Sequence, residues 1–120
     1  METDTPAPVN IEGFRATMRE AGIEEIVDMT LNIYVEEAGR LFGELSAAFE
    51  SQDMEVLRAH AHTLKSSSAN IWAQNLAALF ATMEAAASDH DTDTVASIFG
   101  QLRPEFDSVM AHLAEAGATG

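Results

Sequence analysis

Apolar side chains recur every three or four residues along most of the chain, which is the spacing of amphipathic α-helices. A short helix is predicted to begin after Asn10, whose side chain can cap it, and to stop near Gly22. A long helix is predicted over residues 24–50, and a third helix, capped by Asp53, is predicted to end near Asn70.

Two more helices complete the pattern. One is predicted over residues 73–87, followed by a break at residues 88–91. In the last helix the apolar stripe keeps its phase across Pro104, which predicts one kinked helix and not two. No segment reads as a strand. The predicted fold class is therefore all-α, an antiparallel up-down four-helix bundle with a short additional N-terminal helix.

The length of 120 residues suits a single domain with one core. Residues 1–9 are polar and contain prolines, so we expect a disordered tail there. Residues 10–116 are expected to form one helical domain, and residues 117–120 to fray.

Composition narrows the class of protein further. The absence of cysteine excludes disulfides and thiolate metal sites and fits a reducing cytoplasm. No apolar run reaches the roughly 20 residues that cross a bilayer, and the acidic start does not resemble a signal peptide. With a net charge of -14, nucleic acid and anionic membranes are not expected as partners. We therefore expect a cytoplasmic protein.

The third predicted helix carries two histidines that point in nearly opposite directions, because two residues rotate a helix by about 200°. His62 lies outside the apolar stripe and is ringed by the small residues Ala59, Ser66 and Ala69, so a large partner can approach it. His60 is predicted to lie along a helix contact. This spacing cannot bring both rings to one metal ion, and no metal site is predicted.

The segment that begins at His62 resembles the His-x-x-Lys-Gly-Ser signature of the histidine phosphotransfer (HPt) domain family. The resemblance extends loosely over residues 20–115, and it implies that His62 accepts and donates a phosphoryl group. The family usually has glycine where Ser66 and Trp72 stand. The residues that match the signature are His62, Lys65, Ser66 and Ser67.

The chemistry that the resemblance implies assigns three roles. A neutral nitrogen of His62 would attack phosphorus, and the ammonium of Lys65, one turn away, would stabilise charge on the phosphoryl oxygens. If the third and fourth helices turn near residue 73, Glu84 faces His62 and can orient its ring, as Glu or Gln often does in the family. The alternative is a surface carboxylate that does not contact the ring.

The resemblance also implies the partners, which are a response regulator receiver domain and a histidine kinase. The expected contact residues are Arg58, Ala59, Ser66, Ala69 and Trp72. No nucleotide-binding motif is present, so we expect a phosphoryl carrier without ATP-dependent kinase activity of its own. We expect a monomer without a cofactor, and Mg²⁺ would belong to the partner receiver domain.

Two interpretations stay open at the level of sequence. Residues 56–83 contain no acid, either because packed helices expose few acidic positions or because this surface admits a phosphoryl group or an acidic partner.

The alternative function is that of a non-catalytic, degenerate HPt protein that binds receivers or acts as a scaffold. Ser66 and Trp72, which stand where the family usually has glycine, favour this alternative. A hydrolase is disfavoured because no nucleophile set with a plausible geometry is present.

Overall fold

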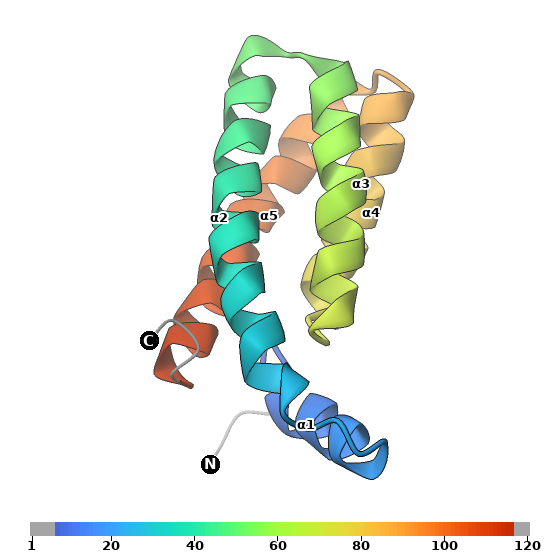
Figure 1. Ribbon diagram of the computed structural model, residues 1–120. Helices are drawn as coiled ribbons and strands as arrows, with labels where there is room; N and C mark the ends of the chain where they lie inside the picture. Colours follow the sequence, from blue (N-terminus) through green and yellow to red (C-terminus); the bar gives the residue numbers. More distant parts are fainter. Residues whose placement is uncertain (1–6, 117–120) are drawn as a thin grey trace, which may run out of the picture.

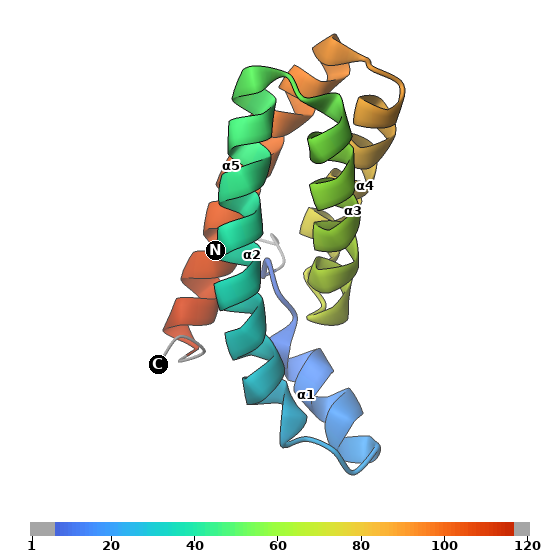
Figure 2. The same ribbon diagram turned by 45° about the horizontal axis from the view of Figure 1, so that its top comes forward.

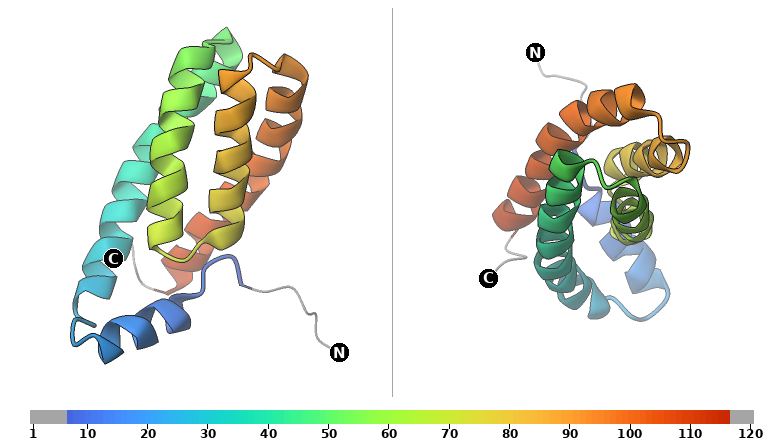
Figure 3. Two further views of the ribbon diagram at one scale, coloured as in Figure 1. Left: turned by 90° about the vertical axis from the view of Figure 1, so that its right-hand side faces the viewer. Right: turned by 90° about the horizontal axis from the view of Figure 1, so that it is seen from above.

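The computed structural model describes residues 7–116, and five helices account for most of them, with no strand in that range. They are α1 (Ile11–Glu20), α2 (Ile26–Ser51), α3 (Met54–Asn70), α4 (Gln74–Ser88) and α5 (Thr92–Glu115). The four long helices run alternately up and down, while α1 lies at the end of the bundle where α2 starts and α3 ends (Figures 1 and 3). The predicted all-α class is confirmed.

Side-chain caps begin three of these helices. The carboxamide oxygen of Asn10 accepts a hydrogen bond from the backbone N–H of Gly13 at 2.9 Å. The carboxylate of Asp53 accepts from the N–H of Val56 at 3.2 Å, and Asp91 caps α5 in the same way. Such a cap contributes about 1 kcal/mol, and the two caps predicted from the sequence, Asn10 and Asp53, are confirmed.

Four helices end in a left-handed residue, and only one of these residues is glycine. The backbone φ angles are 80° at Gly22, 59° at Gln52, 67° at Trp72 and 55° at His90. After each of them, the next N–H reaches back five residues to a helix carbonyl, as Ala73 does to Ser68 at 2.9 Å. The left-handed conformation costs a non-glycine residue about 1–2 kcal/mol, and the hydrogen bonds that close the helix end offset part of this cost.

Trp72 also makes tertiary contacts. Its ring stacks on Phe14 of α1, with 6.4 Å between the ring centroids and 20° between the planes. Its carbonyl oxygen accepts a hydrogen bond from the N–H of Asn10 at 3.3 Å. The residue that replaces the usual glycine of the α3–α4 turn therefore anchors α1 to the bundle.

The prediction of a disordered tail over residues 1–9 is wrong for Val9. Val9 is 1 % exposed and belongs to the hydrophobic core, because the contacts around Trp72 draw the chain before α1 against the bundle. The rest of the tail up to residue 6, and the end at residues 117–120 that was expected to fray, lie outside the described residues.

The last helix is continuous through Pro104, as the unbroken apolar stripe predicted. Proline has no N–H to donate to the carbonyl four residues earlier, which is that of Gly100. Both residues are exposed, so water can satisfy this carbonyl and the helix need not end.

Aromatic rings fill the core between α2 and α5, the neighbouring helices of the bundle that approach each other least closely. Phe42 stacks on Phe106, with 4.2 Å between the centroids, and meets Phe80 of α4 edge-on at 6.3 Å. Phe49 stacks on Phe99 at 4.1 Å. Phe42 thus joins α2 to α4 and α5, which are three of the four long helices of the bundle in Figure 2.

A buried hydrogen bond joins α2 to α3. The hydroxyl groups of Tyr34 and Ser68 lie 2.9 Å apart, and the two residues are 4 % and 0 % exposed. Among the described residues Ser68 is the one buried polar residue. Burial raises the pKa of the Tyr34 phenol to about 12, although the hydrogen bond with Ser68 opposes part of this rise.

Tyr34 is the only tyrosine of the chain, so its ionisation can be measured directly. With a folded pKa of about 12 and an ordinary value of 10.0, the buried phenol contributes its full stabilisation below pH 10 and loses it as the pH rises toward 12. The loss amounts to about 3 kcal/mol. We expect no tyrosinate absorbance from the folded protein at pH 10, where the urea-unfolded chain is half ionised. Equal titration of both states would contradict the burial.

Candidate functional site

His62 occupies the outer face of α3, near the middle of the helix. Its side chain is 60 % exposed, because the surrounding residues Ala59, Ser66 and Ala69 are too short to cover the ring and are exposed themselves. The open environment that the sequence predicted is present. A partner can reach the imidazole without any movement of the helix.

Glu84 of α4 holds one edge of that ring. Its Oε2 lies 2.9 Å from Nδ1 of His62, because α3 and α4 form an antiparallel hairpin that brings these two positions together. An ionised carboxylate only accepts hydrogen bonds, so Nδ1 carries the proton of this contact. In the neutral imidazole, the other nitrogen, Nε2, then keeps its lone pair. The predicted contact between His62 and Glu84 is present, and the alternative of an unconnected surface acid is wrong.

Lys65 binds the same carboxylate. Its Nζ lies 2.7 Å from Oε1 of Glu84, so one carboxylate receives a hydrogen bond from each side. The hydrogen bond from Lys65 is the main cause that lowers the pKa of Glu84, and the contact with His62 adds to it against the opposing effect of burial. The sequence placed Lys65 on the face of His62, but it did not predict that Glu84 would bind its ammonium.

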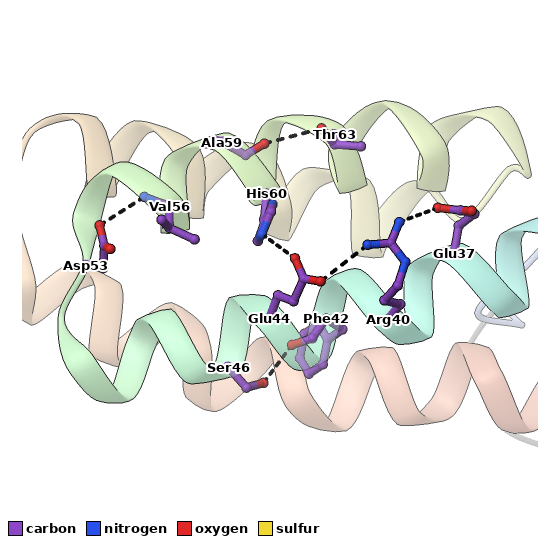
Figure 4. A network of polar contacts seen from close by, with 10 residues as sticks. All are labelled: Glu37, Arg40, Phe42, Glu44, Ser46, Asp53, Val56, Ala59, His60 and Thr63. Atoms are coloured by element: carbon purple, nitrogen blue, oxygen red, sulfur yellow. Dashed lines mark hydrogen bonds and ion pairs between the residues drawn. The ribbon is translucent and has the colours of Figure 1, made fainter.

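His60 lies on the other side of α3 and faces α2 (Figure 4). Its Nε2 is 3.0 Å from Oε1 of Glu44, and its side chain is 22 % exposed. Glu44 also contacts Arg40, which in turn binds Glu37. The predicted position along a helix contact is confirmed, and this histidine lacks the open surroundings of His62.

Two of the three serines after Lys65 make hydrogen bonds within the fold. The hydroxyl of Ser67 donates to the backbone carbonyl of Thr63 at 3.1 Å, and Ser68 contacts Tyr34 in the core. Ser66 alone is exposed beside His62.

The residues expected to contact a partner separate into two groups. Ala59, Ser66 and Ala69 surround His62, and Arg58 lies one turn before it on the same helix, where it pairs with Glu55 at 3.0 Å. Trp72 is at the end of the bundle against α1. The structure therefore does not bring Trp72 together with the histidine.

A groove between α2 and α3 was not predicted from the sequence. It encloses about 230 Å³, and its lining includes Ile33, Tyr34, Leu41 and Thr63. The available signal was Ile33, an apolar residue of α2 that lies off the inward stripe of this helix and is 54 % exposed. Such a residue is noticed in the sequence only when the outward-facing positions of the helix are read as well as the inward-facing ones.

Residues 7–116 contain no group of three or more His, Cys, Asp or Glu side chains able to hold a metal ion. No helix in this range has the length and apolar character needed to cross a membrane.

Comparison with protein families identifies the class. The model of the Hpt domain matches residues 29–116, so the chain belongs to the Hpt domain family. Domains of this family act in phosphotransfer signalling by two-component systems, where they interact with histidine kinases and response regulator receivers. The resemblance predicted from the signature is confirmed. No match to the chain is found among the curated proteins or among the solved structures.

The shared carboxylate of Glu84 predicts a pH dependence. Because the fold lowers the pKa of Glu84 below 4.5, its ion pair stabilises the protein above that pH and is lost as the pH falls through the folded value. We expect Glu84→Gln to lower the free energy of unfolding by up to about 1 kcal/mol at neutral pH. The two proteins should become equally stable in acid, as measured by urea denaturation.

The matched control is Glu36→Gln, which removes one carboxylate from the exposed face of α2. This control distinguishes the loss of the Glu84 ion pair from the weaker charge repulsion that follows when any one carboxylate is removed from a protein of net charge -14. Identical pH profiles for the two variants would contradict a stabilising role of the Glu84 contacts.

Proposed function

We propose that this protein is a phosphoryl carrier and that His62 is the residue it uses. It would receive the phosphoryl group from a histidine kinase or a receiver aspartate and pass it to a receiver domain. The observation that supports this most strongly is the contact between Nδ1 of His62 and Glu84 on a ring that is 60 % exposed. It leaves the second nitrogen free and in the open.

In the proposed step, the lone pair of Nε2 attacks the phosphorus of an aspartyl phosphate on the receiver. A nitrogen–phosphorus bond forms while the phosphorus–oxygen bond breaks, and the aspartate carboxylate leaves with the electron pair. The proton on Nδ1 stays in its hydrogen bond to Glu84, so no proton has to leave the attacking atom. Transfer onward to a second receiver is the reverse reaction, and Mg²⁺ would be bound by the receiver.

Lys65 would provide positive charge beside the reacting group. Transfer of a phosphoryl group spreads negative charge over three oxygens, and a fixed cation nearby lowers the barrier. Its ammonium binds Glu84 at 2.7 Å in the unphosphorylated protein, so it starts from a defined position one turn from the ring.

The alternative function was a degenerate domain that binds receivers without transfer, and it drew on two departures from the family signature. The contacts of Trp72 with Phe14 and Asn10 supply a structural reason for one of them, away from His62. Ser66 keeps a small side chain at the exposed position beside the histidine. Neither departure obstructs access to Nε2, which favours the carrier.

The first test exchanges each histidine separately. We expect the wild-type protein to incorporate an acid-labile, base-stable phosphoryl group from phosphoramidate, whose phosphorus–nitrogen bond breaks as ammonia leaves. His62→Gln should abolish incorporation, whereas His60→Gln should retain most of it, because only His62 has an open ring held by a carboxylate. Intact-mass spectrometry at neutral pH measures both. Undiminished labelling of His62→Gln would overturn the assignment.

A second test concerns docking of the receiver. A receiver carries acidic metal ligands around its aspartate by family analogy, so a carboxylate beside His62 should repel it. Ala69 is exposed two turns along the same face of α3. We expect Ala69→Glu to weaken the affinity for an acceptor receiver by about tenfold or more, the effect of 1.4 kcal/mol, and Ala69→Gln to weaken it much less.

The control for added charge is Ser97→Glu, at an exposed position of α5. Thermal unfolding should show that all three variants remain folded. Equal losses of affinity for Ala69→Glu and Ser97→Glu would indicate general charge repulsion, while unchanged affinity for Ala69→Glu would place the receiver on another face.

A further inference from the structure

The chain has few cations, and most of them belong to helices other than α3 and α4, which carry His62 and Glu84. Only Arg58 and Lys65 of the six Lys and Arg side chains belong to α3 or α4. The other four belong to α1, α2 and α5, where three pair with acids and the fourth lies over the ring of Phe42. A phosphoryl group on His62 can therefore draw positive charge from these two residues of α3.

Lys65 is already engaged. Glu84 binds its ammonium at 2.7 Å and holds the ring of His62 at 2.9 Å with the other oxygen. If Lys65 moved away from Glu84, the carboxylate of Glu84 would lose its cation and remain as an unpaired negative charge beside the phosphorylated ring. Because a phosphoryl group brings about two negative charges, one neutralised lysine does not balance it.

Arg58 is the other cation, and its position on α3 suits it. It precedes His62 by four residues, a spacing at which side chains on a helix are neighbours with about 6 Å between Cβ atoms. Side chains of a helix lean toward its N-terminus, so the ring of His62 leans over the turn that carries Arg58. No acid stands between them in the sequence, and the small Ala59 leaves the space beside the ring open.

The present partner of Arg58 is easily given up. It pairs with Glu55 at 3.0 Å through one nitrogen, and the two side chains are 39 % and 80 % exposed. Exposed pairs of this kind contribute little to stability. A guanidinium also offers parallel N–H donors that match two phosphoryl oxygens, which a single carboxylate contact does not use.

We propose that Arg58 is a second phosphoryl-binding residue of this site, which leaves Glu55 and binds the phosphoryl oxygens when His62 is phosphorylated. The proposal rests on the carrier function proposed above. In the unphosphorylated protein Glu55 binds Arg58 one turn from the histidine, and phosphorylation transfers this guanidinium to the phosphoryl oxygens. Glu84 meanwhile keeps Lys65 and the ring in place.

The test measures the rate of phosphorylation by phosphoramidate, which needs no partner protein. We expect Arg58→Gln to slow phosphorylation of His62 about fivefold to tenfold, since a charge-assisted hydrogen bond to the incoming phosphoryl group is lost. Arg58→Lys should recover part of the rate. Glu55→Gln should raise the rate, because it frees the guanidinium.

A direct readout accompanies the kinetics. In ¹H–¹⁵N spectra of the wild-type protein, the Nε–H resonance of Arg58 should shift on phosphorylation, and that of Arg19 should not. Arg19→Gln is the matched control, because it removes the same charge from an exposed ion pair on α1.

Each outcome decides the proposal. A slower rate for Arg58→Gln alone, together with a shifted resonance, supports it. An unchanged rate and resonance overturn it, and so does an equal loss in Arg19→Gln, which would indicate general attraction of an anion. Failure of the wild-type protein to be labelled at His62 would instead overturn the carrier function itself.

Discussion

The carboxylate of Glu84 is the point on which the site depends. It accepts from Nδ1 of His62 and from Nζ of Lys65 at the same time, so it orients the ring and positions a cation across the contact between two helices. A neutral amide could bond to the ring, but it would not form an ion pair with the lysine. The arrangement requires that α4 place its only acid beside the exposed face of α3, and the hairpin does this because the turn between the helices is short.

That turn connects the site to the rest of the fold. Trp72 occupies it in the left-handed conformation that glycine adopts most easily, and the stacking of its ring on Phe14 offsets part of the conformational cost. On the other side of α3, the buried bond between Tyr34 and Ser68 ties the helix to α2. α3 is thus fixed by polar contacts on the sides that face its neighbours, while its outer face, which carries His62, stays open.

The charges of the protein are also distributed unevenly between the surface around His62 and the rest of the chain. The protein is strongly acidic, but the stretch of 56–83 has no acid, and its two cations lie on the helix that bears His62. Acids border this surface where they have a partner, Glu84 beside Lys65 and Glu55 beside Arg58. An exposed ring whose bordering acids are paired with cations suits the proposed reaction, in which a neutral imidazole and an anionic aspartyl phosphate must approach each other.

The sequence by itself determined the features that depend on neighbouring residues. The helical period and the capping residues Asn10 and Asp53 act within a few neighbouring residues, so the five helices and the outward position of His62 could be predicted. The partner of His62 could be predicted as well, because a short turn between two helices leaves one antiparallel register. The attachment of Lys65 to Glu84, the stacking of Trp72 on α1 and the burial of Val9 were decided only by the tertiary structure. Each of these contacts depends on where a separate helix comes to lie, and no local period in the sequence carries that information.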